Sequence, residues 1–218
     1  MTPLVAMDGT NPDLPYPQTA DLDLLAAFLE GRALPGSGRS AAAALMEAFD
    51  GLAGVGAADA AALIRAGLPA EAVADLGRVR ALALAMARDE ACRRPVVSSW
   101  TALIIYLRSS LAHLPREQFR ALYLDRRNIL IRDEMRADGT VDQAPVFPRE
   151  VVRRALELSA SAMILVHNHP SGDPTPSQAD IAMTRKIVDA AQVFDIKVHD
   201  HVIVGREGTK SFRALGLM

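Results

Sequence analysis

An apolar run at residues 161–166 passes directly into the sequence His-Asn-His-Pro at residues 167–170. A short apolar run of this kind is typical of a buried strand. Because side chains alternate along a strand, we expect His167 and His169 on the same face, about 7 Å apart. Two imidazoles at this spacing can converge on one metal ion, so the end of this strand is a candidate metal site.

A carboxylate follows the two histidines at a separation that the chain can close. Residues 171–176 are a loop rich in Gly and Pro, and apolar residues recur with helical spacing after Asp180. We expect Asp180 at the start of a helix, where the loop can bring it back to His167 and His169. Two His, one Asp and an open fourth position make up a catalytic rather than a structural zinc site. Ser177 and Asp180 also have the spacing of a helix N-cap, so capping alone can explain Ser177.

The longer string around these residues resembles a known family. His-x-His-Pro, then six residues, then Ser-x-x-Asp resembles the JAMM motif of MPN/JAB-domain metalloproteases. The whole string from His167 to Asp180 is similar to the RadC branch of that family (UPF0758) in particular. The resemblance is strong over about residues 96–218 and loose before them. It implies an α/β domain with an MPN/JAB-type mixed sheet flanked by helices, preceded by a small all-helical, helix-hairpin-helix-like domain.

The resemblance also implies a general base. In the family this base is a Glu at the entrance of the first core strand, after the first helix. Glu117 is the best positional match, because an apolar helical stretch precedes it and strand-like alternation begins at Phe119. Glu134, at the end of the second expected strand, and Glu150, in the first turn of a helix, are the alternatives.

The implied chemistry is hydrolysis of an amide, peptide or isopeptide bond by metal-activated water. One zinc ion per chain would be held by His167, His169 and Asp180 and would lower the pKa of water to about 7. Glu117 would accept the proton and return it to the leaving amine. Ser177 would donate a hydrogen bond to the developing oxyanion. A peptide or protein is then the expected substrate.

Two other classes of function stay open. One is a DNA-associated or protein-interaction module that retains a vestigial metal site. The other is a metal-dependent phosphodiesterase acting on nucleic acid. An open metal position favours an enzyme, and a steep salt dependence of DNA binding would favour a nuclease.

Length and composition limit the remaining possibilities. With 218 residues, 50% of them hydrophobic, and a formal net charge of −2, the chain can bury a core as one or two domains. No apolar run approaches the roughly 18 residues that span a bilayer, and no secretory signal is visible. The single cysteine, Cys92, excludes an intrachain disulfide and fits a reducing compartment. We therefore expect a cytoplasmic protein without a membrane partner.

Changes in composition suggest three segments. Residues 1–20 have the pattern of an irregular lead-in, residues 21–95 that of a helical bundle, and residues 96–218 mix strands with helices. Within the last segment the expected strands are 119–125, 129–135, 161–167 and 197–204, the expected helices are 148–159 and 177–194, and turns are expected at 126–127 and 138–139. Strands interleaved with helices predict a layered α/β domain.

The helical segment is a weak candidate for DNA binding. A helix-hairpin-helix module grips phosphates through the backbone amides of a Gly-hydrophobic-Gly turn. In the turn at residues 67–69 the second Gly is replaced by Pro69, which has no N–H. The turn at residues 54–56 keeps both glycines but has no basic residue near it. Residues 1–95 carry 8 Lys/Arg and 12 Asp/Glu, a net charge of −4, which disfavours phosphate binding.

Two further histidines lie on the last expected strand. His199 and His201 alternate with valines, so we expect them on one face of the strand. A second metal site is conceivable there. A packing or supporting role for His201 fits the pattern better.

Overall fold

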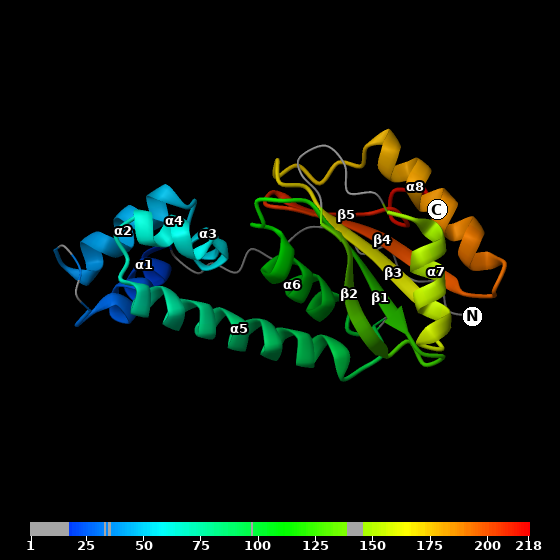
Figure 1. Cartoon of the computed structure of the whole chain (residues 1–218), viewed down its shortest axis with the longest axis horizontal. Coiled ribbons are helices and arrows are strands. Elements are labelled where there is room, and N and C mark those ends of the chain that lie inside the picture. Colours follow the sequence, from blue (N-terminus) through cyan, green and yellow to red (C-terminus); the bar gives the residue numbers. More distant parts are fainter. Residues whose placement is uncertain (1–17, 33, 35, 97, 139–145) are drawn as a thin grey trace. The chain divides into compact units, whose positions relative to one another are not determined.

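The structure, a computed structural model, describes residues 18–32, 34, 36–96, 98–138 and 146–218. The chain divides into two compact units, and the division falls between Met86 and Ala87, inside a long helix (Figure 1). The helical segment begins at Gln18, before residue 21, where we expected it. Most of the expected irregular lead-in lies outside the described residues.

The described residues of the first unit form helices joined by turns, which confirms the expected N-terminal helical region. Its helices are α1 (Gln18–Leu29), α2 (Gly38–Ala48), α3 (Leu52–Ala57), α4 (Ala60–Arg65) and the first part of α5 (Ala70–Cys92). Apolar residues at helical spacing, such as Leu25, Leu29 and Leu45, are buried in a common core. This unit carries no part of the His and Asp cluster described below.

Of the two glycine-containing turns considered above, only one joins two helices. Residues 54–56 lie within α3, where a Cβ on Gly54 would come within 1.6 Å of the Phe49 carbonyl oxygen. Residues 67–69 join α4 to α5, with Gly67 at a φ of 95° and Leu68 buried. The turn between helices is therefore the one that ends in Pro69.

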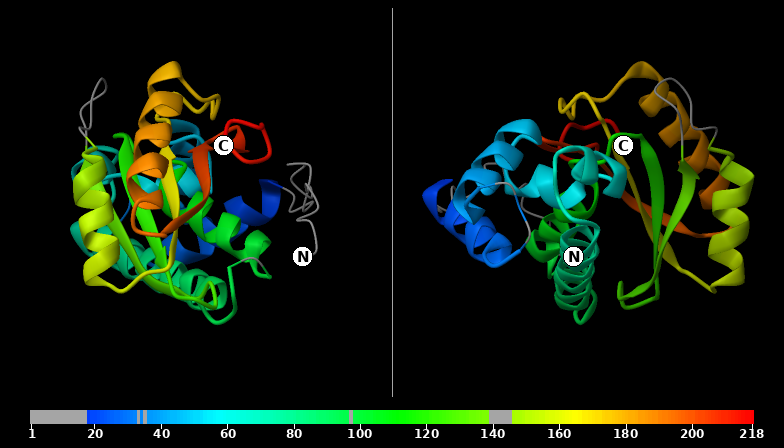
Figure 2. Two further views of the ribbon diagram at one scale, coloured as in Figure 1. Left: turned by 90° about the vertical axis from the view of Figure 1, so that its right-hand side faces the viewer. Right: turned by 60° about the vertical axis from the view of Figure 1, so that its left-hand side comes forward.

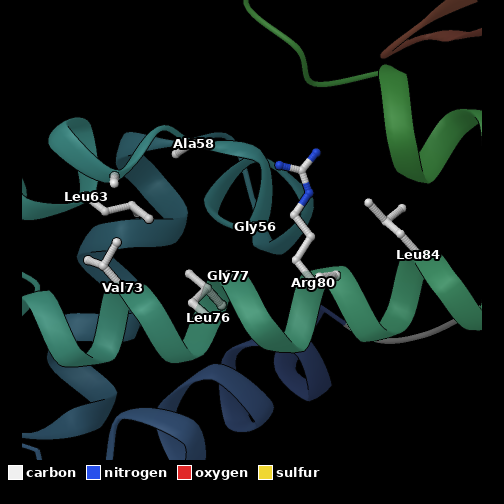
Figure 3. A pocket seen from close by; sticks show the side chains of 10 residues that line it. Gly56, Ala58, Leu63, Val73, Leu76, Gly77, Arg80 and Leu84 are labelled. Atoms are coloured by element: carbon white, nitrogen blue, oxygen red, sulfur yellow. The ribbon is translucent and has the colours of Figure 1, made fainter. Parts of the chain in front are cut away.

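The helical unit also has a pocket beside α5 (Figure 3). Its wall is mostly apolar and includes Leu63, Val73, Leu76 and Leu84, with the Arg80 side chain at one side. All of the lining residues belong to the first unit.

The second unit contains a five-stranded mixed sheet with the order β2-β1-β3-β4-β5. The strands are β1 (Gln118–Leu124), β2 (Leu130–Asp138), β3 (Ala162–Asn168), β4 (Lys197–Gly205) and β5 (Gly208–Ser211). β3 and β4 are parallel, whereas the other neighbours are antiparallel. The mixed sheet expected from the sequence is therefore confirmed.

Helices cover both faces of this sheet (Figures 1 and 2). α6 (Trp100–Leu111) lies on one face, and α7 (Pro148–Glu157) and α8 (Gln178–Gln192) lie on the other. Along β3, Ile164 and Val166 pack toward α6, whereas Met163 and Leu165 pack toward α7 and α8. Every residue of β3 is buried, and this explains why its sequence is a continuous apolar run.

The elements expected in the second unit agree with the structure, with ends that differ by three residues at most. The turn at residues 126–127 connects β1 to β2, as expected. A turn was also expected at residues 138–139. Asp138 is the last residue of β2, and Gly139 lies outside the described residues. β5 was not predicted, because four residues without an apolar alternation give no strand signal.

The connection from β3 through α8 to the parallel strand β4 positions the candidate site. A ligand site in such a unit commonly lies at the carboxyl ends of parallel strands. Here the carboxyl end of β3 carries the histidines, and the N-terminus of α8 carries Asp180. Among the described residues, no helix is both long and apolar enough to cross a membrane.

Candidate metal centre

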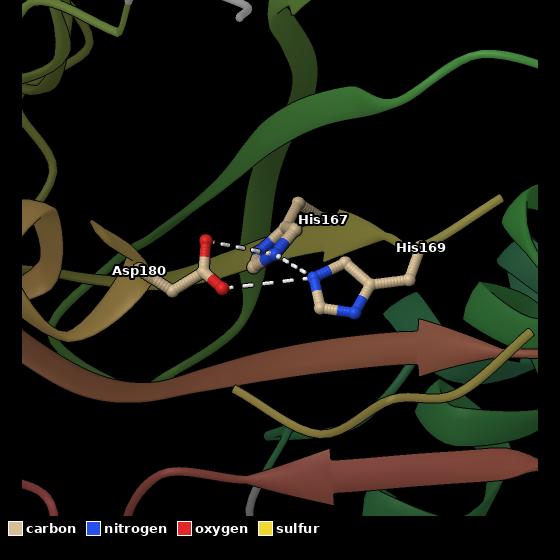
Figure 4. Close-up of side chains that lie close together, drawn as sticks. All are labelled: His167, His169 and Asp180. Atoms are coloured by element: carbon tan, nitrogen blue, oxygen red, sulfur yellow. Dashed lines mark hydrogen bonds and ion pairs between the residues drawn. The ribbon is translucent and has the colours of Figure 1, made fainter. Parts of the chain in front are cut away.

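His167, His169 and Asp180 converge at the end of β3 (Figure 4). The Nε2 atoms of the two histidines are 3.0 Å apart. The carboxylate of Asp180 lies 3.2 Å from Nε2 of His167 and 3.6 Å from Nε2 of His169. His167 is buried, whereas His169 and Asp180 are partly exposed. The structure therefore brings together the three ligands expected from the sequence.

The donor set fits a tetrahedral metal ion. Nδ1 of His169 lies 2.8 Å from the Asp173 carbonyl oxygen, so a neutral His169 carries its proton there. Its Nε2 lone pair then faces Nε2 of His167 and the Asp180 carboxylate, which is an unfavourable grouping unless a cation or a proton lies between them. Zinc ligands at about 2.0–2.1 Å in a tetrahedron are about 3.4 Å apart. The 3.0 Å between the two Nε2 atoms and the 3.2 Å between Nε2 of His167 and Oδ1 of Asp180 are close to this value, whereas the 3.6 Å contact of His169 is with the other carboxylate oxygen, Oδ2.

The same contacts shift two pKa values. Burial alone would raise the pKa of Asp180, but the neighbouring His167 and His169 outweigh it and hold the pKa well below its usual range. The hydrogen bond to Asp180 raises the pKa of His169 against the opposing effect of burial. The negative charge of Glu117 adds a smaller upward contribution. Asp180 is therefore ionised, as a metal ligand would have to be.

A capping box places Asp180 at the start of α8. Ser177 is the N-cap, and its hydroxyl accepts from the N–H of Asp180 at 3.2 Å. In return, Oδ2 of Asp180 accepts from the N–H of Ser177 at 2.7 Å and from its hydroxyl at 2.6 Å. The capping explanation of Ser177 is therefore confirmed, and the same contacts orient the Asp180 carboxylate.

Glu117 lies next to the cluster because of the register of β1 and β3. Phe119 pairs with His167 across the two strands, and its ring lies 6.4 Å from the imidazole. Glu117 comes one residue before β1, and continuing the register by two residues beyond the Phe119 and His167 pair would place it opposite His169. The electrostatic effect of Glu117 on His169 agrees with this placement.

A buried side chain holds the backbone around Glu117. Asn168 is fully buried, and its amide oxygen accepts from the N–H of Gln118 at 2.8 Å. Its amide nitrogen donates to the carbonyl oxygen of Arg116 at 3.1 Å. One carboxamide therefore binds the peptide groups on both sides of Glu117. No role was expected for Asn168 from the sequence, although a polar residue between two candidate ligands and at the end of an apolar run is a usable signal.

The two alternative bases have other partners. Glu134 accepts hydrogen bonds from Arg154 at 2.6 to 3.1 Å and from Arg136 at 3.3 Å. The hydrogen bonds from Arg154 lower the pKa of Glu134 despite partial burial. Glu150 pairs with Arg153 at 3.0 Å on the surface of α7. These interactions join both carboxylates to arginines and not to the cluster.

A β-bulge separates the two histidines of β4. Met163 pairs with Val198 but Ile164 pairs with Asp200, so His199 is an extra residue in the strand. Nε2 of His199 lies 2.7 Å from the side-chain oxygen of Asn128.

His201 instead contacts the candidate centre, with its Nε2 2.8 Å from Nδ1 of His167. Burial lowers the pKa of His201 well below its usual value. The expectation that His199 and His201 share a face is wrong, and the candidate metal-binding group found among the described residues contains neither of them. The supporting role expected for His201 agrees with its contact to His167.

A family model matches most of the second unit, and two relatives match longer stretches of the chain. Residues 97–217 match the family model described as a RadC-like JAB domain. A UPF0758 protein of Rhodobacter capsulatus is 52% identical over 200 residues, which cover 91% of this chain and 93% of that protein. A UPF0758 protein of Ruegeria pomeroyi is 55% identical over 146 residues, which cover 67% of this chain and 65% of that protein. The segment that matches the family model contains Glu117 and all three residues of the cluster.

Proposed function

Because the chain belongs to the family of RadC-like JAB-domain proteins, we propose that it is a zinc-dependent hydrolase acting on an amide, peptide or isopeptide bond. The observation that carries the proposal is the convergence of two imidazole nitrogens and one carboxylate with zinc-like separations. A structural zinc site is closed by four protein ligands. Among the described residues, this group has three members, which favours a catalytic site.

His167, His169 and Asp180 would hold the ion, one per chain. A zinc ion bound there would supply Lewis acidity and lower the pKa of water to about 7. Glu117 then acts as the general base: its carboxylate accepts a proton from the attacking water and returns it to the leaving amine. Asn168 supports this step by fixing the two peptide groups that flank Glu117.

Ser177 has two tasks in this proposal. Its hydroxyl donates to Oδ2 of Asp180 in the structure, and its backbone N–H donates to the same oxygen. Rotation of the side chain would free the hydroxyl while the N–H continues to hold Asp180. The freed hydroxyl would stabilise the oxyanion that forms at the substrate carbonyl, a type of contact that contributes about 3 kcal/mol.

A peptide or protein is the substrate class that this chemistry suits, and we place the reaction in the cytoplasm. The charge of the matched segment gives little support to nucleic acid as substrate. Residues 96–218 carry 16 Lys/Arg and 14 Asp/Glu, a net charge of +2, so we expect no strong attraction for a polyanion.

Hydrolysis by the zinc-loaded full chain tests the proposal. The chain is incubated with a peptide library, an isopeptide-linked peptide pair and single- and double-stranded DNA, and the products are identified by mass spectrometry. We expect cleavage of an amide bond that Glu117→Gln abolishes while zinc content stays near one per chain. Glu150→Gln is the matched control, since Glu150 is a surface carboxylate paired with Arg153.

Three outcomes would contradict the proposal. Cleavage of DNA without cleavage of any amide would indicate a phosphodiesterase. Full activity in Glu117→Gln would remove that residue as the base. A chain that binds no metal at neutral pH would leave a vestigial site.

A further inference from the structure

A chain of hydrogen bonds joins the backbone of Asp180 to the ring of His167 through Thr184 and His201. The Thr184 hydroxyl lies 2.6 Å from the carbonyl oxygen of Asp180 and 2.6 Å from Nδ1 of His201. Nε2 of His201 lies 2.8 Å from Nδ1 of His167. Thr184 and His201 are each 1% exposed, so bulk water does not compete for these contacts. Side chains from β3, β4 and α8 are thereby coupled.

The protons available determine the direction of each hydrogen bond. A carbonyl oxygen can only accept, so Thr184 donates its single hydroxyl proton to Asp180. Nδ1 of His201 must then carry the proton that it shares with the Thr184 oxygen. In a neutral ring this leaves Nε2 of His201 as an acceptor, so His167 donates from Nδ1. The remaining lone pair of His167, on Nε2, then faces the Asp180 carboxylate.

Aromatic side chains hold the His201 ring in place. The ring of Phe212 is stacked on it with centroids 4.6 Å apart, and Phe119 meets it edge-on at 5.7 Å. The N–H of Phe212 donates to the backbone carbonyl of His201 at 2.9 Å. This apolar enclosure favours an uncharged imidazole, because burial disfavours the charged form.

We propose that Thr184 and His201 are positioning residues that fix the tautomer and orientation of His167, and so set the affinity of the site for zinc. The proposal rests on the metal-dependent function proposed above and extends it to two residues that would not touch the ion. Ligand histidines generally need such a partner on the second ring nitrogen, and loss of the partner lowers metal affinity about 10–100-fold.

Zinc affinity of full-length variants, measured by competition with a chelator, gives the first test. His201→Phe keeps an aromatic ring but removes both nitrogens, and Thr184→Val keeps the shape but removes the hydroxyl. We expect each to weaken zinc binding by about 10–100-fold. His201→Gln returns an acceptor for His167, and Thr184→Ser returns the hydroxyl, so both should recover much of the affinity.

His199→Phe is the matched control, because it makes the same substitution on the same strand at a ring that contacts Asn128. It should bind zinc like the wild type. Circular dichroism identifies any variant that fails to fold. The absorption bands of bound Co²⁺ should shift in His201→Phe and stay unchanged in His199→Phe. Wild-type zinc affinity in both folded His201→Phe and Thr184→Val would overturn the proposal.

Nitrogen NMR of the metal-free wild-type chain reads the tautomers directly and needs no variant. We expect His167 and His201 to be protonated on Nδ1 and bare on Nε2. A proton on Nε2 of His201 would contradict the proposed chain of hydrogen bonds. If these tautomers are found but the wild type binds no zinc, the proposed hydrolase function fails, while the chain of hydrogen bonds stands as a structural feature of the cluster.

Discussion

The turn between α4 and α5 and the cluster at the end of β3 are both places where a backbone turn could serve a ligand. In the turn, Leu68 is buried and the helices pack, but Pro69 offers no N–H to a phosphate. In the cluster, Asp180 keeps three hydrogen bonds with Ser177 in addition to its histidine contacts. Packing alone therefore maintains a turn that lacks the second backbone donor, whereas in the cluster polar contacts orient one side chain toward two others.

Removal of a candidate metal ligand should have the largest effect on zinc binding. If it had none, the contrast between the cluster and the turn would not hold. His167→Ala or His169→Ala leaves two of three ligands, so we expect zinc content to fall from about one ion per chain to almost none. Mass spectrometry of the intact protein and elemental analysis measure this loss. His199→Ala should retain the metal, because His199 pairs with Asn128 outside the cluster. A double variant at 167 and 169 with full zinc content would refute the ligand assignment.

Substitution of Asn168 should rank second. Asn168→Ala removes the partner of the Gln118 N–H and of the Arg116 carbonyl, two contacts that are partly buried. A lost hydrogen bond costs about 1 kcal/mol, so urea unfolding followed by Trp100 fluorescence should shift to lower urea. Hydrolysis should fall more than zinc content does. Asn128→Gly removes an amide elsewhere in the same unit and keeps a positive φ possible; an equal loss of hydrolysis there would contradict a specific role for Asn168.

A pair of N-cap substitutions compares the two units directly. Ser177 and Ser37 each accept an N–H at 3.2 Å from the residue three positions later. Ser177→Ala and Ser37→Ala should each cost about 1 kcal/mol of unfolding free energy, measured by urea denaturation. Only Ser177→Ala should also weaken zinc binding, by roughly tenfold, because Ser177 holds Asp180, the proposed metal ligand. Equal zinc affinities in the two variants would show that the cap serves α8 alone.

DNA binding should show the smallest effect, close to none. The full chain has a formal net charge of −2, and Pro69 ends the turn between α4 and α5, so few counterions should be released on contact with DNA. Fluorescence anisotropy with a duplex at two salt concentrations measures this. Sub-micromolar binding at physiological salt that weakens steeply with added salt would show that the helical unit keeps a DNA-binding function.

The sequence predicted the parts of the second unit that depend on local patterns. The run at residues 161–166 specifies a strand buried on both faces, and the loop and N-cap that follow specify where α8 begins. His167, His169 and Asp180 could be predicted together because strand periodicity and a short loop determine their placement. The assignment of Glu117 as base stays a prediction, which the register of β1 supports.

The parts that the sequence did not predict depend on contacts between distant segments. The bulge at His199 reverses the alternation on which the shared histidine face depended. Thr184 looked like an ordinary helical residue, although its position four residues after Asp180 places both on one helix face. Asn168 binds backbone groups some fifty residues earlier in the chain. The pairings of Thr184 with His201 and of Asn168 with residues 116 and 118 have no local periodic signal.

A crystal structure of the zinc-loaded chain, with anomalous data at the zinc edge, tests the central claim most directly. We predict one strong peak bound by Nε2 of His167, Nε2 of His169 and the Asp180 carboxylate, at about 2.0–2.2 Å. The Glu117 carboxylate should lie within about 3 Å of the remaining zinc ligand. A peak elsewhere, a fourth protein ligand that closes the site, or Glu117 turned to solvent would contradict the account.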